Sequence, residues 1–86
     1  MQKVIGKMNA GYEIIDIVPT GLDEGYVIGC NGKSYATWWV TQRAWGFDFY
    51  HGHYFNIDWT MPDKTRAQAR ADLYDRVSKD YAFKAK

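Results

Sequence analysis

The chain has 86 residues, of which 47% are hydrophobic and 17% aromatic, and its formal net charge at pH 7 is +1. This length allows one small domain, residues 1–86, and the aromatic content argues against disorder. A charge so close to zero predicts no global attraction for polyanions such as nucleic acids. Cys30 is the single cysteine, which rules out an intrachain disulfide and favours a reducing compartment. Residues 1–7 lack an apolar leader-like run and no stretch approaches membrane-spanning length, so we expect a cytoplasmic protein.

Strand-forming residues dominate the first half of the chain. Val4 and Ile5 suggest a short edge strand, and residues 12–18 are rich in β-branched side chains. Pro19 and Gly21 end this second strand, because proline cannot continue a hydrogen-bonded ladder and glycine supplies a positive φ.

A hairpin is expected next, between strands at 25–30 and 33–42. Asn31-Gly32 lies between them and is the preferred pair for a two-residue type I′ turn. Such a turn would place Gly25 opposite Trp38 and leave room there for the indole ring. The pairing also fixes the two faces of the sheet. One face would carry Tyr26, Ile28, Tyr35, Thr37, Trp39 and Thr41, and the other Ala36, Trp38 and Val40.

The stretch 47–59 carries the strongest pattern in the sequence, because it alternates with the period of two that is typical of a strand. One predicted face is apolar and carries two imidazoles: Phe47, Phe49, His51, His53, Phe55, Ile57 and Trp59. The opposite predicted face is polar and carries two phenols: Asp48, Tyr50, Gly52, Tyr54, Asn56 and Asp58. We expect the last strand of the sheet here.

A helix is predicted over residues 64–81, which contain helix formers without glycine or proline. Residues 60–63 supply a cap, a first-turn proline and an acidic residue for the helix start. At 100° per residue, one arc collects Ala67, Leu73, Tyr74, Val77 and Tyr81, with Arg66 and Arg70 inside it. We therefore predict an α+β fold: a four-stranded antiparallel β-meander with one C-terminal α-helix packed on one face. Trp38 and Phe49 are expected in the core, with Trp38 under the helix.

Three segments of the chain suggest a relationship: Tyr35-x-Thr37-Trp38, Tyr50-x-Gly52-His53-Tyr54-Phe55 and Asp72-Leu73-Tyr74-x-Arg76-Val77. Together they resemble a set of small single-domain bacterial proteins that have no assigned activity and are associated with gut bacteria and mobile elements. The resemblance covers about residues 5–81, although residues 39–47 are longer and more aromatic than in that set. It implies a bacterial, cytoplasmic accessory protein and no catalytic residues.

His51 and His53 are two residues apart, so on a regular strand both imidazoles would point to the same side, as metal ligands require. A site needs a third ligand, for which Cys30, Asp48 and Asp58 are the available residue types, but none is spaced to match. The alternative is that both histidines are hydrogen-bonded within or beside the apolar face, so we treat them as weak metal candidates and expect no cofactor. A thiol enzyme with a Cys30–histidine pair is a further hypothesis, although the turn next to Cys30 favours a structural cysteine.

Basic residues near the helix start form another candidate site. The residues that could contact phosphates are Arg43, Lys64, Arg66 and Arg70. The alternative is that their aliphatic stems lie along the sheet while their charged ends pair with Asp16, Asp48 or Asp58. The small net charge favours this alternative.

Aromatic side chains exceed what one core needs. A helix covers one face of a four-stranded sheet, yet both predicted faces carry rings, and large exposed apolar patches usually mark interfaces. We therefore hypothesise a non-enzymatic accessory or interaction module that binds a macromolecular partner, or a second copy of itself as a homodimer, through an aromatic sheet face. The expected binding residues are Tyr26, Tyr35, Trp39, Tyr50 and Tyr54. The alternatives are a single-stranded nucleic-acid binding protein, in which such rings stack on bases, and a small metal- or thiol-dependent enzyme.

Overall fold

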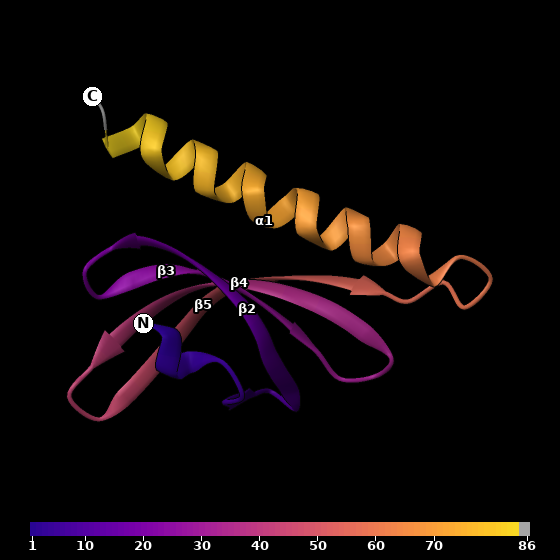
Figure 1. Ribbon diagram of the computed structural model, residues 1–86, viewed down its shortest axis with the longest axis horizontal. Helices are drawn as coiled ribbons and strands as arrows, with labels where there is room; N and C mark the ends of the chain where they lie inside the picture. Colours follow the sequence, from indigo (N-terminus) through magenta and orange to yellow (C-terminus); the bar gives the residue numbers. More distant parts are fainter. Residues whose placement is uncertain (85–86) are drawn as a thin grey trace.

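The computed structural model describes residues 1–84, apart from the side chains of residues 82 and 83. The backbone forms a five-stranded antiparallel sheet followed by one long helix (Figure 1). Neighbouring strands in the sheet are also neighbours in the chain, as in a meander. The α+β class, the antiparallel sheet and the C-terminal helix are thus confirmed. The elements are η1 (Gln2–Val4, a 3-10 helix), β1 (Met8–Asn9), β2 (Tyr12–Gly21), β3 (Glu24–Cys30), β4 (Ser34–Arg43), β5 (Gly46–Asn56) and α1 (Pro62–Lys84).

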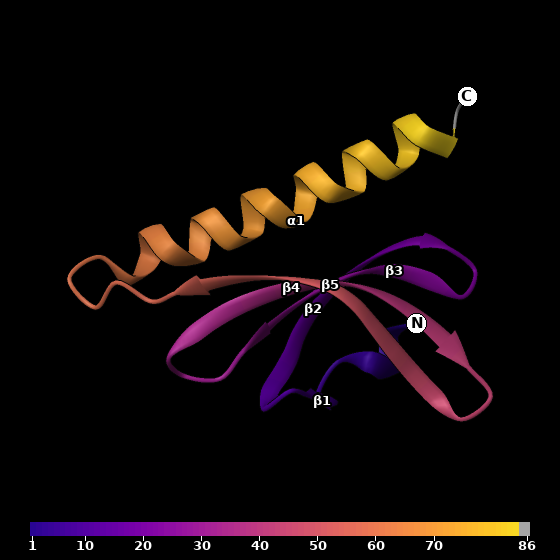
Figure 2. The same cartoon turned by 180° about the vertical axis from the view of Figure 1, so that it is seen from behind.

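The sheet has five strands rather than the predicted four, and it curls into a nearly closed barrel. The additional strand is β1, which pairs Met8 with Glu13 and Asn9 with Tyr12. A strand of two residues has no alternating pattern that sequence analysis could detect. Val4, expected in an edge strand, lies in η1 and is fully buried. Figure 1 and Figure 2 show β2 to β5 crossing over one another, as in a strongly twisted sheet.

The curled sheet encloses one core and shares a second core with α1. Both sides of the central strands are therefore buried. The outer core, between the sheet and the helix, consists of Ile28, Ala69 and Leu73. Phe47 and Phe49 of β5 pack against the inner core. The inner core consists of Val4, Tyr12, Ile14, Ile17, Val27, Ala36, Trp38 and Val40.

Trp38 is buried as predicted, with 3% of its surface exposed, but it lies in the inner core and not under α1. Its ring meets Tyr12 and Phe49 edge-to-face, with centroids 5.4 and 6.0 Å away. The glycines beside it are Gly29 and Gly52 and not Gly25, because a Cβ added to Gly29 would lie 3.0 Å from the indole Cζ3 and one added to Gly52 would lie 2.7 Å from the indole Nε1. The prediction that the helix covers Trp38 is wrong, because a curled sheet buries its concave face on itself and α1 packs on the other face.

The β3–β4 hairpin has the predicted faces but a different register. Cys30 pairs with Tyr35 and not with Lys33. The side-chain oxygen of Asn31 accepts hydrogen bonds from the backbone N–H groups of Lys33 and Ser34, both at 2.8 Å. These bonds stabilise a loop longer than the expected two-residue turn. Because the register moves by two residues, every side chain keeps its face.

A β-bulge at His51 divides β5 into two segments with opposite alternation. The pairing of β4 with β5 shifts between Thr37 and Trp39, and His51 has φ +56°. The extra residue switches the face on which later side chains lie. Phe49 and Tyr54 therefore both contact Trp38 in the inner core. The predicted faces of the stretch 47–59 are correct for the residues before the bulge. For the strand residues after the bulge, the two faces are exchanged. The outer face carries Tyr50, His53 and Phe55.

α1 packs on the outer face through a narrow i,i+4 stripe. Of the predicted apolar arc, Leu73 and Val77 are buried, whereas Tyr74 and Tyr81 are about half exposed. The arc is therefore rotated from its predicted position. No helix within residues 1–84 is long and apolar enough to cross a membrane. The buried stripe consists of Thr65, Ala69, Leu73 and Val77.

Candidate functional site

Two of the aromatic residues expected to bind a partner lie under α1. Tyr26 and Tyr35 both pack against the outer core. The Tyr26 hydroxyl donates to Asp80 Oδ1 at 3.3 Å, and the Arg76 guanidinium carbon lies 5.3 Å from the centre of the Tyr26 ring. Burial, together with the negative charge of Asp80, raises the pKa of Tyr26. The expectation that these two rings face away from the helix is therefore wrong.

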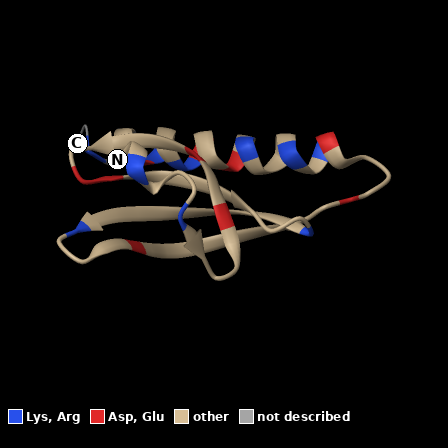
Figure 3. Cartoon of the chain, turned by 60° about the horizontal axis from the view of Figure 1, so that its bottom comes forward, with Lys and Arg blue, Asp and Glu red and all other residues tan. Residues whose placement is uncertain are grey.

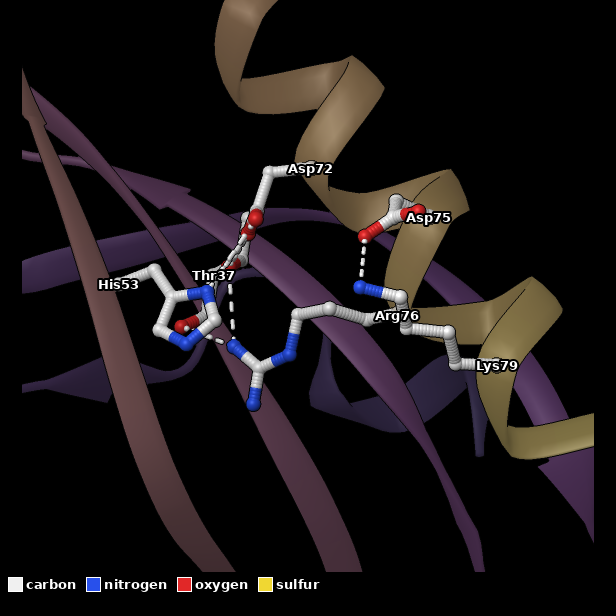
Figure 4. A network of polar contacts seen from close by, with 6 residues as sticks. All are labelled: Thr37, His53, Asp72, Asp75, Arg76 and Lys79. Atoms are coloured by element: carbon white, nitrogen blue, oxygen red, sulfur yellow. Dashed lines mark hydrogen bonds and ion pairs between the residues drawn. The ribbon is translucent and has the colours of Figure 1, made fainter. Parts of the chain in front are cut away.

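A network of polar side chains joins α1 to the outer face of β4 and β5 (Figure 4). Thr37, which is fully buried, donates from its hydroxyl to Asp72 Oδ2 at 2.6 Å. Arg76 donates from Nη1 to the Thr37 hydroxyl at 3.0 Å and to the Thr37 carbonyl oxygen at 3.1 Å. His53 Nδ1 lies 3.0 Å from Asp72 Oδ2. The buried hydroxyl is thus fully hydrogen-bonded, as buried polar groups in folded proteins usually are.

The network belongs to a charged row on α1 whose contacts with the sheet were not predicted from the sequence. Removal from water lowers the pKa of Arg76, and the nearby Asp72 carboxylate acts in the opposite direction. Further along the helix, Lys84 lies 3.1 Å from Asp80 and also pairs with Glu24 of β3. The sequence signal for this row is the i,i+4 alternation of acid and base beside the buried stripe. Its members are Asp72, Arg76, Asp80 and Lys84.

This network has the geometry of a link between helix and sheet. Nucleophilic catalysis requires a hydroxyl or thiol that is hydrogen-bonded to its base. The Thr37 hydroxyl is bonded to Asp72 and Arg76 instead of His53, and it is closed off from solvent. The clearest effect of the network is therefore to fix α1 on the sheet.

The bulge separates the two histidines. His53 turns to Asp72, whereas His51 occupies the bulge, with its ring centroid 6.5 Å from that of Tyr50. The regular strand assumed for a His-x-His metal site is therefore interrupted. Within residues 1–84, no three His, Cys, Asp or Glu side chains gather in a way that could hold a metal ion. Cys30 lies at the β3–β4 loop, where its sulfur accepts a backbone N–H at 3.4 Å.

Two of the basic residues expected to contact phosphates are paired with acids. Arg43, at the end of β4, lies 3.9 Å from Asp48 of β5. Arg70 lies 3.1 Å from Asp16 of β2. Both pairs agree with the alternative interpretation, in which these basic residues cover the sheet and pair with its carboxylates.

The basic residues are also spread over the molecule. Lys64 and Arg66 lie exposed in the first turns of α1. Figure 1 shows this end of the helix and the β4–β5 hairpin, which carries Arg43, on opposite sides. Figure 3 shows acidic and basic residues mixed along α1 and few charges on the strands. The four predicted phosphate-contacting residues therefore do not form one patch.

Trp39 and Tyr50 occupy the part of the outer face that α1 leaves open. Their rings are 5.0 Å apart between centroids, at 38° to each other, and both are partly exposed. They lie toward the β4–β5 hairpin, which Figure 1 and Figure 2 show turning away from the helix. Arg43 and Asp48 flank them toward the hairpin tip. Thr41, between these pairs, is 5% exposed, and its hydroxyl has no hydrogen-bond partner within the described part of the chain.

Tyr54 lies on the opposite face from the Trp39–Tyr50 pair. The residue is 57% exposed, and its ring centroid lies 6.0 Å from that of Trp38 and 5.9 Å from that of Tyr12. Tyr54 therefore covers the rim of the inner core. Of the five aromatic residues expected to bind together, the structure brings Trp39 and Tyr50 together on an open surface.

Comparisons with models of protein families, with curated proteins and with solved structures found no match for the chain. The relationship to small proteins of gut bacteria therefore stays a prediction. On the outer face of the sheet, Trp39 and Tyr50 form a pair of packed, partly exposed rings.

Proposed function

We propose that this protein is a non-enzymatic interaction module that associates through the Trp39–Tyr50 pair. The observation that carries the proposal is a pair of packed rings, 5.0 Å apart, on the section of the outer face that the helix leaves open. Aromatic residues of this kind are enriched in protein interfaces, where truncation of an anchor commonly weakens binding by at least about 2 kcal/mol, or about 30-fold in Kd. The resemblance and the lone cysteine support a role as an accessory protein in the bacterial cytoplasm.

The rings are held in place before a partner arrives. Trp39 and Tyr50 are directly paired across β4 and β5, next to the bulge at His51. A side chain that is already ordered loses less conformational entropy on binding. The hairpin can therefore present both rings as a rigid surface.

A second copy of the chain is the favoured partner. Arg43 and Asp48 bring charges of opposite sign to the same end of the ring pair. In a two-fold dimer each surface meets its own copy, so a patch with both signs can be self-complementary. A single-stranded nucleic acid would instead favour a basic surface around the rings, whereas the cation beside them is already paired with an acid.

Sedimentation equilibrium over a range of concentrations tests this proposal. We expect wild-type protein to form dimers, Trp39→Ala to weaken them at least about 30-fold, and Trp59→Ala to leave them unchanged. Trp59 is the matched control because it is a 69% exposed tryptophan outside the sheet. Urea melts of Trp39→Ala should show that the monomer stays folded.

Two results would reject self-association through this surface: a wild-type protein that is monomeric at every concentration, or a dimer that Trp39→Ala leaves intact. A mixed-sequence single-stranded oligonucleotide provides a further arm. Binding that is steeply salt-dependent and lost in Trp39→Ala would support the nucleic-acid alternative instead.

A further inference from the structure

A pocket opens at the seam of the barrel, where β1 and the start of β5 approach each other. In the sheet order these two strands are at opposite ends and do not pair. The cavity has a volume of about 300 Å³, at the lower end of the range of ligand pockets. We call it the seam pocket. It is lined by Lys7, Met8, Trp45, Gly46, Phe47 and Phe49.

We propose that the seam pocket binds a small carboxylic acid with an aromatic or short aliphatic body. The apolar residues that line the pocket support the proposal that the ligand has an apolar body. Phe47 and Phe49 pack against the inner core and form ordered walls. Met8 and Trp45 are 61% and 77% exposed and lie at the two edges of the seam. Large apolar side chains left in water on both sides of a cavity are suited to close over an apolar ligand.

The positive charge at the pocket supports the proposal that the ligand carries a carboxylate group. Lys7 is the only lining residue with a formal charge. Among the described residues no carboxylate lies within ion-pair distance of its ammonium group. The acid nearest in sequence to the lining residues, Asp48, is already paired with Arg43 and accepts a hydrogen bond from Trp45 Nε1 at 3.4 Å. A ligand carboxylate would therefore meet a cation that is not neutralised, and charge-assisted hydrogen bonds are the stronger kind.

Hydrogen bonds hold the backbone of Lys7 in place at the edge of the pocket. Lys7 donates its N–H to the carbonyl oxygen of Val4 at 3.0 Å, and its carbonyl oxygen accepts the N–H of Ile14 at 2.9 Å. On the other side, Gly46 has φ +133°, and a Cβ added there would have no neighbour within 4 Å. Part of the pocket wall is therefore bare backbone beside open space.

The cavity volume is sufficient for one ring and a short chain. A cavity of about 150 Å³ in another protein holds benzene. The seam pocket, with about 300 Å³, is about twice that volume. An arylalkyl acid with a single ring and two or three further carbons fits this space.

Titration of the ¹⁵N-labelled protein with 3-phenylpropionate, followed by NMR, tests this proposal. We expect saturable shifts of the amides of residues 7–8 and 45–49, and weaker binding of the uncharged analogue 3-phenylpropan-1-ol. Lys7→Met should weaken binding of the acid roughly 10- to 100-fold, the effect expected for loss of one hydrogen bond to a charged group. Lys33→Met is the matched control, because Lys33 is an exposed lysine in the β3–β4 loop.

Several outcomes would overturn the proposal. They are an absence of saturable shifts at millimolar acid, shifts centred on the Trp39–Tyr50 pair, equal affinity for the acid and the alcohol, or equal effects of Lys7→Met and Lys33→Met. The amide spectra of the free variants show directly whether each is folded. The seam pocket and the Trp39–Tyr50 surface consist of different residues, so either proposal can fail without the other.

Discussion

Asp72→Ala should destabilise the fold by about 2–4 kcal/mol, because it removes the shared acceptor of the polar network. The buried Thr37 hydroxyl would lose the acceptor that it contacts at 2.6 Å, and hydrogen bonds to charged groups contribute about 1.5–3 kcal/mol. Loss of the His53 contact adds less than about 1 kcal/mol, because the imidazole is half exposed. The partly buried Arg76 would also lose its nearby counter-charge, which accounts for the upper end of the range.

A double-mutant cycle with Arg76→Met can separate these contributions. The double variant lacks both Asp72 and Arg76, so no unpaired cation remains beside the sheet. Its loss of unfolding free energy should therefore be at least about 1 kcal/mol smaller than the sum of the losses in the two single variants. Urea melts followed by tryptophan fluorescence at pH 7 measure each unfolding free energy. Asp75→Ala is the control, because it removes an exposed pair with Lys79 on the same helix (Figure 4) and should not change stability measurably.

A loss below about 1 kcal/mol for Asp72→Ala, or one equal to that of Asp75→Ala, would refute the network as a link between helix and sheet. Additive effects in the cycle would show that Asp72 and Arg76 act independently. In either case the apolar stripe alone would have to position α1.

Substitutions at three further positions test the core, the helix interface and the bulge. Gly29→Ala should cost about 1–3 kcal/mol in urea melts, because its methyl group would lie 3.0 Å from the Trp38 ring; an unchanged midpoint would show that the ring can move aside. The raised pKa of Tyr26 means that its stabilising effect is complete below about pH 10 and is lost as the pH rises through that pKa. Tyr26→Phe should therefore flatten the alkaline decline in melts between pH 8 and 11, whereas Tyr74→Phe should not. His51→Gly should keep or raise stability by up to about 1 kcal/mol, because glycine adopts φ +56° freely, and His51→Val should lower it; equal melting curves would contradict the bulge.

The general architecture could be predicted because it depends on short-range signals. Periodicity identifies the strands over 12–18, 25–30 and 33–42, and the absence of glycine and proline identifies the helix. The expectation that Pro19 and Gly21 end the second strand is wrong, because β2 continues through both and pairs with β3 there. Even the faces of the β3–β4 hairpin were correct, because its register moved by two residues and not by one. The extra strand β1 could not be found, because two residues show no period.

The side of the sheet covered by the helix could not be predicted from local patterns. The buried stripe of α1 is narrow and contains Thr65 and Ala69. A prediction from hydrophobicity instead selects the side of the helix that carries Tyr74 and Tyr81, and that side is exposed. The curvature of the sheet decides where Trp38 is buried, and bulges, which local patterns do not reveal, contribute to this curvature. The polar network was missed because its residues are up to 39 positions apart.

The bulge at His51 connects these observations. Strict alternation along β5 would direct His53 and Phe55 to the inner core together with Phe49, and would leave the helix without the partner of Asp72. One additional residue lets the first half of β5 supply Phe49 to the inner core while its second half supplies Phe55 to the outer core. Bulges also bend and twist the strand that contains them, and the β4–β5 hairpin turns away from α1 on the side before the bulge. The bulge at His51 thus has two effects. It places His53 and Phe55 on the side of the helix, and it accounts for the open position of Tyr50 beside Trp39, where we propose that the protein binds its partner.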